Sequence, residues 1–258
     1  MAAVNGTLVA RPVRTTRPGP RGFERQLQLS CRPMHRSSRL EGRAAAGSGA
    51  GSLAPPRAPV VAILAVVVTA VVGALAWSPQ RPSGVDAWAV HALTVSPGSL
   101  PYRFASRLDD TMRVMGALAG SLAVALVAWV LLRRRDVVVA SLVVAPATVA
   151  DEQLLKLAGR RSLGLVSFSY PSGRAALATS LVLLLVSVLR AAGVRPAVRA
   201  LVAISGTVYV LAMAWARAST GVHLLTDVVG GMSMGVAVTL VTLLVLTAPR
   251  QSNPKKDR

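Results

Sequence analysis

The sequence predicts an all-α fold, a polytopic membrane bundle of about six transmembrane helices. Hydrophobic residues make up 53% of the chain, and they come in long uninterrupted blocks rather than at amphipathic spacing. Polar stretches rich in arginine or proline separate these blocks. Each block is long enough, or nearly so, to cross roughly 30 Å of hydrocarbon at about 1.5 Å per residue.

The chain divides into a membrane domain and two tails. Residues 1–58 are rich in Arg, Gly, Pro and Ser and contain no apolar run that could form a core, so we expect a disordered basic cytoplasmic tail. No apolar run with a small-residue cleavage site follows the first basic residues, which argues against a signal peptide. Residues 59–247 form the predicted membrane domain, and 248–258 a cytoplasmic C-terminal tail. The single cysteine, Cys31, excludes an internal disulfide framework.

The first two spans are uniformly apolar. Residues 59–77 are uncharged and predict the first span, and 114–132 predict the second, which three consecutive arginines terminate. Residues 78–112 between them are polar and contain several prolines. We expect an external loop here, with an interfacial helix around 85–93.

The other four spans carry charges near one end. The uncharged stretch after residue 136 is short for a crossing, so the third helix should continue through 151–152 towards Lys156. The fourth span, 172–189, has Arg174 in its first turn. The fifth, 200–216, runs into Arg217, and the sixth, 224–246, has Asp227 in its opening turn.

The distribution of basic residues predicts the topology. If the arginine-rich tail is cytoplasmic, counting crossings places most basic residues in cytoplasmic segments, as the positive-inside rule requires. The net charge of +19 is then explained by cytoplasmic loops and contact with anionic headgroups, and nucleic acid is not an expected partner. We expect a multi-pass plasma-membrane protein with both termini in the cytoplasm. The dominance of arginine over lysine indicates a GC-rich, bacterial source.

The same count places a polar cluster at the extracytoplasmic ends of spans three to six. Charges inside a membrane are costly, about 2.5 to 3.5 kcal/mol at its centre, so such residues indicate function. Several cations beside one imidazole and one carboxylate suit a phosphate dianion. The cluster comprises Lys156, Arg160, Arg161, Ser172, Arg174, Arg217, His223 and Asp227.

His223 and Asp227 are the candidates for chemistry within this cluster. Their spacing places them one helical turn apart on one face. The aspartate can accept a hydrogen bond from one ring nitrogen and leave the other free as a nucleophile or base. Structural explanations suffice for other residues: Gly230, Gly231 and Gly235 are explained by close helix packing.

The cluster resembles the signatures of the type 2 phosphatidic acid phosphatase superfamily. Arg217, His223 and Asp227 match its third signature, Arg-x5-His-x3-Asp. The segment 171–173, Pro-Ser-Gly, resembles the second signature, Pro-Ser-Gly-His, and Lys156 opens a weak version of the first, Lys-x6-Arg-Pro. The resemblance covers residues from about 59 to 247 and is strongest at the third signature.

This resemblance implies a metal-independent reaction with no cofactor. In the family, the histidine at the position of His223 attacks phosphorus and forms a phosphohistidine, and the aspartate at the position of Asp227 orients the ring. The phosphate-binding roles would fall to Lys156, Ser172, Gly173 and Arg217.

The chain departs from the family pattern twice. Arg174 stands where the second signature has the histidine that protonates the leaving group, and arginine stabilises charge but cannot act as a general acid. Leu163 and Gly164 stand where the first signature has Arg-Pro, and Arg160 or Arg161 could reach the same phosphate. Because a departing phosphate needs less protonation than an alkoxide, Arg174 favours a diphosphate such as a prenyl diphosphate.

The predicted function is hydrolysis of a phosphate or diphosphate from a membrane lipid at the extracytoplasmic face. The alternative is a catalytically silent relative that binds or moves phospholipid headgroups. A transporter would place substrate groups near mid-membrane, where these spans are apolar. The sequence predicts neither the lipid nor the oligomeric state.

Overall fold

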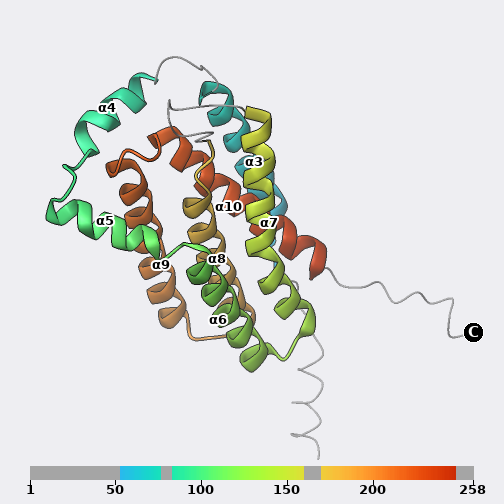
Figure 1. The fold of residues 1–258 in the computed structure, drawn as a ribbon. Coiled ribbons are helices and arrows are strands. Elements are labelled where there is room, and N and C mark those ends of the chain that lie inside the picture. The colour runs from blue at the N-terminus through green and yellow to red at the C-terminus, as the bar shows by residue number, and fades with distance from the viewer. Residues whose placement is uncertain (1–52, 77–82, 160–169, 248–258) are drawn as a thin grey trace, which may run out of the picture. The chain divides into compact units, whose positions relative to one another are not determined.

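The computed structural model describes residues 53–76, 83–159 and 170–247, and these residues form helices and connecting turns without strands. The chain is all-α, as predicted. The helices in chain order are α3 (Ala58–Ala76), α4 (Gly84–Leu93), α5 (Leu100–Asp110), α6 (Val114–Leu132), α7 (Arg135–Gly159), α8 (Gly173–Ala191), α9 (Pro196–Ser219) and α10 (Leu225–Leu246) (Figure 1). Most of the tails predicted at 1–58 and 248–258 lies outside the described residues.

Six of the described helices are long and apolar enough to cross a membrane: α3, α6, α7, α8, α9 and α10. They coincide with the six predicted spans to within a few residues. Large apolar side chains lie exposed on the outer helices, including Ile63 at 64% on α3, Leu126 at 62% on α6 and Leu201 at 64% on α9. Exposed apolar surface of this extent is stable only in lipid. The protein is therefore a multi-pass membrane protein.

The core lies around α8 and α10. Leu184 and Val188 on α8 are fully buried against Leu240 and Leu243 on α10, and helices α3, α6 and α7 contribute small and β-branched side chains to the same cluster. Helix α10 packs on α3, α7 and α8. This packing fixes the first turns of α8 and α10 relative to each other.

Glycines on α10 permit this close approach. A Cβ on Gly231 would collide with the backbone of Ser172, and a Cβ on Gly235 would collide with the backbone of Ala176. The predicted role of these glycines in close helix packing is thus confirmed. Gly230 leaves room for the ring of Tyr170, which also contacts Gly73 of α3.

The segment between the first two spans contains two short helices that lie beside α9 (Figure 1). Helix α4 matches the predicted interfacial helix, and Ser83 caps it by accepting the Asp86 N–H. Helix α5 was not predicted. Ser99 caps it in the same way, and Phe104 lies against Trp215 of α9, with 6.3 Å between the ring centroids. The two short helices bring polar residues of this segment to the end of the bundle where the predicted site residues gather.

Candidate active site

The turn between α9 and α10 forms the centre of the candidate site. Helix α9 ends where the Thr220 hydroxyl donates to the carbonyl of Ala216 at 2.8 Å. Gly221 then adopts φ +72°, a left-handed conformation that glycine accepts without steric cost and that commonly terminates helices. The chain reverses, and the His223 N–H donates to the carbonyl of Arg217 at 3.3 Å. The turn therefore places the histidine directly beside the last turn of α9.

Asp227 caps the start of α10 and lies beside the histidine. Its Oδ2 accepts the backbone N–H of Leu224 at 3.0 Å, so the carboxylate satisfies a free donor at the helix N-terminus, where the helix dipole favours negative charge. The same oxygen lies 3.5 Å from Nδ1 of His223. This separation is longer than a normal hydrogen bond, and catalytic contacts commonly tighten only when substrate binds.

The N-terminus of α8 faces this pair. The backbone N–H of Ser172 donates to the carbonyl of Asp227 at 2.9 Å, and the side chain of Ser172 is fully buried. The following N–H groups of the first turn have no partner within the helix and attract anions. A Cβ on Gly173 would meet the carboxylate of Glu152 from α7, so a side chain there would require Glu152 to move.

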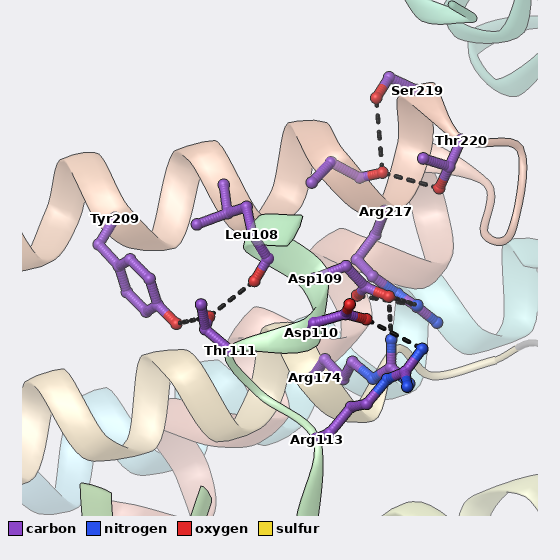
Figure 2. A network of polar contacts seen from close by, with 11 residues as sticks. Leu108, Asp109, Asp110, Thr111, Arg113, Arg174, Tyr209, Arg217, Ser219 and Thr220 are labelled. Carbon is purple, nitrogen blue, oxygen red and sulfur yellow. Dashed lines mark hydrogen bonds and ion pairs between the residues drawn. The ribbon is translucent and has the colours of Figure 1, made fainter. Parts of the chain in front are cut away.

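The cations of the site are paired with carboxylates. Arg217 Nη1 donates to both oxygens of Asp109, each at 2.9 Å, and Arg174 donates to Asp109 as well (Figure 2). Lys156 pairs with Glu152 one turn earlier on α7. Two acidic side chains therefore occupy positions at which phosphate oxygens could bind the same donors.

Buried donors without partners also gather here. Four buried side-chain polar atoms in the described part of the chain make no hydrogen bond, and buried polar groups rarely remain unpaired unless a ligand uses them. One, Nε of Arg199, lies in the first turn of α9. The other three belong to predicted site residues: Oγ of Ser172, Nε of Arg217 and Nδ1 of His223.

Burial sets the charge state of the histidine. The His223 side chain is 6% exposed, and desolvation lowers its pKa below the ordinary value. The charges of Arg217 and Lys156 lower it further, and Asp227 opposes the shift without cancelling it. The imidazole is therefore neutral near pH 7, the form in which a ring nitrogen has a free lone pair.

Tyr170 closes the site on the side of α3. Burial, and then the charge of Asp227, raise the pKa of its phenol to about 12. The hydroxyl therefore stays protonated, and it donates to the carbonyl of Thr69 at 2.5 Å. The ring of Tyr170 packs between Gly73 of α3 and Gly230 of α10.

The structure brings together all the predicted site residues that it describes, at the meeting point of α7, α8, α9 and α10. Arg160 and Arg161 lie outside the described residues. Among the described residues, no three carboxylate, imidazole or thiol side chains gather so that they could hold a metal ion.

Sequence reasoning left three acidic residues out of the candidate site. Asp109 and Glu152 pair with the site cations, and Asp86 of α4, fully buried, accepts the N–H of Thr226 at 3.0 Å and its hydroxyl at 2.9 Å. The chain has only 10 acidic residues against 29 basic ones, so each acid next to a span was a signal of a specific partner. Asp86 anchors the first turn of α10 and, with it, Asp227.

Comparisons with known proteins found a similar family and a similar fold. The family model described as PAP2 superfamily matches residues 145–250. The crystal structure of a transmembrane PAP2 type phosphatidylglycerolphosphate phosphatase from Bacillus subtilis superposes with a TM-score of 0.56 at 17% identity, covering 73% of this chain and 94% of that one. No curated protein sequence matches the chain significantly. The matched segment, 145–250, contains every predicted site residue.

Proposed function

We propose that this protein hydrolyses a phosphate or diphosphate group on a membrane lipid through a phosphohistidine intermediate at the extracytoplasmic face. The observation that carries the proposal is the buried imidazole of His223, with Asp227 beside Nδ1 and the cations Arg174 and Arg217 nearby. The family match and the fold of the bacterial phosphatase support the same activity.

In the first step, Nε2 of His223 attacks phosphorus and forms the N–P bond. The bond from phosphorus to the lipid oxygen, or to the bridging oxygen of a diphosphate, breaks, and its electron pair leaves with the lipid product. Asp227 accepts the Nδ1 proton in a hydrogen bond and stabilises the positive charge that develops on the ring.

In the second step, water attacks phosphorus and the N–P bond breaks. Inorganic phosphate leaves, and the water proton passes to bulk solvent or to the departing phosphate. In this proposal Arg217, Lys156, Ser172 and the N-terminus of α8 stabilise the equatorial phosphate oxygens in both steps.

Arg174 gives the site its substrate preference. Fixed positive charge can stabilise a departing phosphate, which is a weak base, but cannot supply the proton that a lipid alkoxide needs. The proposed substrate class is therefore a lipid diphosphate, such as a prenyl diphosphate, ahead of phosphatidic acid.

The distribution of basic residues supports the sidedness. With the N- and C-termini in the cytoplasm, the arginine-rich turns after α6 and α8 are cytoplasmic, and the joined ends of α7, α8, α9 and α10 face outward. We propose the plasma membrane as the location of the protein.

A phosphate-release assay tests the proposal. Purified protein in detergent and chelator is offered a prenyl diphosphate, phosphatidic acid and phosphatidylglycerol phosphate. We expect phosphate release from at least one of these lipids. In His223→Ala the rate of release should fall by at least about a thousandfold, and the melting temperature should not change. The matched control is His91→Ala, which removes an exposed imidazole of α4 and should leave the rate unaltered.

The second candidate is a silent relative that binds lipid headgroups. It is favoured by Arg174, which replaces the proton donor and is paired with Asp109. Saturable binding of the same lipids without any phosphate release would establish this candidate in place of the hydrolase.

A further inference from the structure

Asp109 presents a built-in anion to the phosphate-binding cations. Its carboxylate accepts from Nη1 of Arg217 and from Nη1 of Arg174 (Figure 2), and it comes from α5, outside the segment matched to the family. The side chains of Arg217 and Asp109 are only 8% and 14% exposed. The pair is therefore shielded from solvent, and its charge interaction is stronger than that of a surface ion pair.

The carboxylate is held in place by the packing of α5 on α9. The hydroxyls of Thr111 and Tyr209 lie 2.6 Å apart, and Phe104 lies against Trp215. Both contacts flank Asp109 along the chain. Because the competitor is part of the fold, it returns to the arginines whenever no stronger anion occupies them, as an intramolecular ligand does at high effective concentration.

A lipid phosphate needs the same guanidinium donors. A phosphodiester headgroup carries one negative charge, the same as the carboxylate that it must displace. A phosphomonoester carries about −1.5 to −2 near neutral pH, and a diphosphate carries more. Displacement therefore favours the more highly charged headgroups.

We propose that Asp109 is a specificity-determining residue that excludes phosphodiester lipids from the active site. The bulk anionic lipids of a membrane are phosphodiesters. Without a carboxylate on Arg174 and Arg217, these abundant lipids would occupy the two arginines, although the enzyme cannot hydrolyse them. Because a headgroup must displace the Asp109 carboxylate, only headgroups with a high affinity for the arginines bind, and these are the monoesters and diphosphates. This inference rests on the proposed function, since it concerns the same site.

Binding measurements test the inference without turnover. Short-chain dioctanoyl phosphatidylglycerol and dioctanoyl phosphatidic acid are titrated against the His223→Ala protein, in which the monoester is not hydrolysed. With Asp109 present, the monoester should bind at least about tenfold more tightly than the phosphodiester. Adding Asp109→Asn removes the internal competitor and should tighten phosphodiester binding by at least about fivefold.

The neighbouring residue gives a matched control. Asp110 is on the same helix and pairs with Arg113 at 2.9 Å, with side chains that are 43% and 66% exposed. Asp110→Asn removes the same charge without touching Arg174 or Arg217, and the affinity for the phosphodiester should stay as in the parent protein. In the otherwise wild-type enzyme, Asp109→Asn should make phosphatidylglycerol a stronger competitive inhibitor. Adding phosphatidylglycerol should then raise the apparent KM for substrate more in the variant than in the wild type. Saturating substrate should restore the rate that the variant has without the inhibitor.

Two results would overturn the inference. One is equal affinity of the parent protein for the two lipids, a measurement that needs no folded Asp109 variant. The other is weaker binding of both lipids in Asp109→Asn, which would mean that Asp109 positions the arginines for binding and does not compete with the lipid. Absence of phosphate release from any lipid by the wild type would refute the hydrolase proposal and leave this comparison of affinities intact.

Discussion

Both carboxylate oxygens of Asp109 lie 2.9 Å from Nη1 of Arg217, although the two residues are 108 positions apart in the sequence. This contact joins α5 to the end of α9 and balances the charge of an arginine that is almost fully buried. A buried guanidinium without such a partner would be costly. The site is thus assembled before substrate arrives, with carboxylates on its cations and a neutral histidine beside them.

Replacement of Arg174 should change the substrate preference. The wild type is expected to hydrolyse a prenyl diphosphate faster than phosphatidic acid, because fixed charge stabilises a phosphate leaving group but cannot protonate an alkoxide. Arg174→His restores a proton donor and should raise kcat on the monoester more than on the diphosphate. Initial rates on both lipids measure this. Equal wild-type rates on the two lipids, or no gain on the monoester, would remove the argument.

The pH dependence should reflect the lowered pKa of His223. The reactive form is the neutral ring, so activity persists as pH falls until the pH reaches the folded-state pKa, which burial places below the usual value of about 6.5. Asp227→Asn removes a charge that raises this pKa and should move the transition to still lower pH. NMR of histidine-labelled protein follows the ring directly, and the His223→Ala spectrum assigns its signal. Titration at or above pH 6.5 would contradict the burial argument.

A side chain at Gly231 should damage both stability and activity. A Cβ there meets the backbone of Ser172, so Gly231→Val forces α10 away from the N-terminus of α8 and should cost about 1 to 3 kcal/mol of unfolding free energy. The melting temperature in detergent and the phosphate-release rate should both fall. Gly84→Ala provides the control, because nothing lies within 4 Å of a Cβ at that position. Equal melting temperatures of the two variants would contradict the close contact between α10 and the N-terminus of α8.

The topology predicts which positions react with impermeant thiol reagents in intact cells. In a Cys31→Ser background, a cysteine at the exposed Ser96, between α4 and α5, should be labelled from outside. A cysteine at the exposed Ala197, in the first turn of α9, should react only after the membrane is permeabilised. The reverse pattern would place the site in the cytoplasm.

The spans could be predicted from sequence because long apolar blocks determine transmembrane helices whatever the tertiary structure. The spacing of His223 and Asp227 predicted that the two lie close together on one helix. Helix α10 begins only at Leu225, so His223 lies in the preceding turn, with Nδ1 3.5 Å from Asp227. The glycines of α10 were also predictable, since only small residues allow helices to approach closely in a membrane.

The acidic partners of the site could not be predicted in this way. Asp109 reaches Arg217 only because α5 folds back along α9, and α5 is a short helix whose charged residues made it read as a loop. Asp86 is buried only because α4 packs near the start of α10. These contacts depend on tertiary packing between segments far apart in sequence, which one sequence does not encode as a local pattern.

Direct detection of the covalent intermediate tests the central claim. Protein incubated briefly with a diphosphate lipid labelled with 32P at its terminal phosphate, then denatured with alkali, should retain label with the stability expected of phosphohistidine, stable to base and lost in acid. Peptide mapping should place the label on His223, and Asp227→Asn should slow its appearance by at least about a hundredfold. Steady phosphate release by the wild type with no labelled protein, or with label on another residue, would contradict the assignment of His223 as the nucleophile.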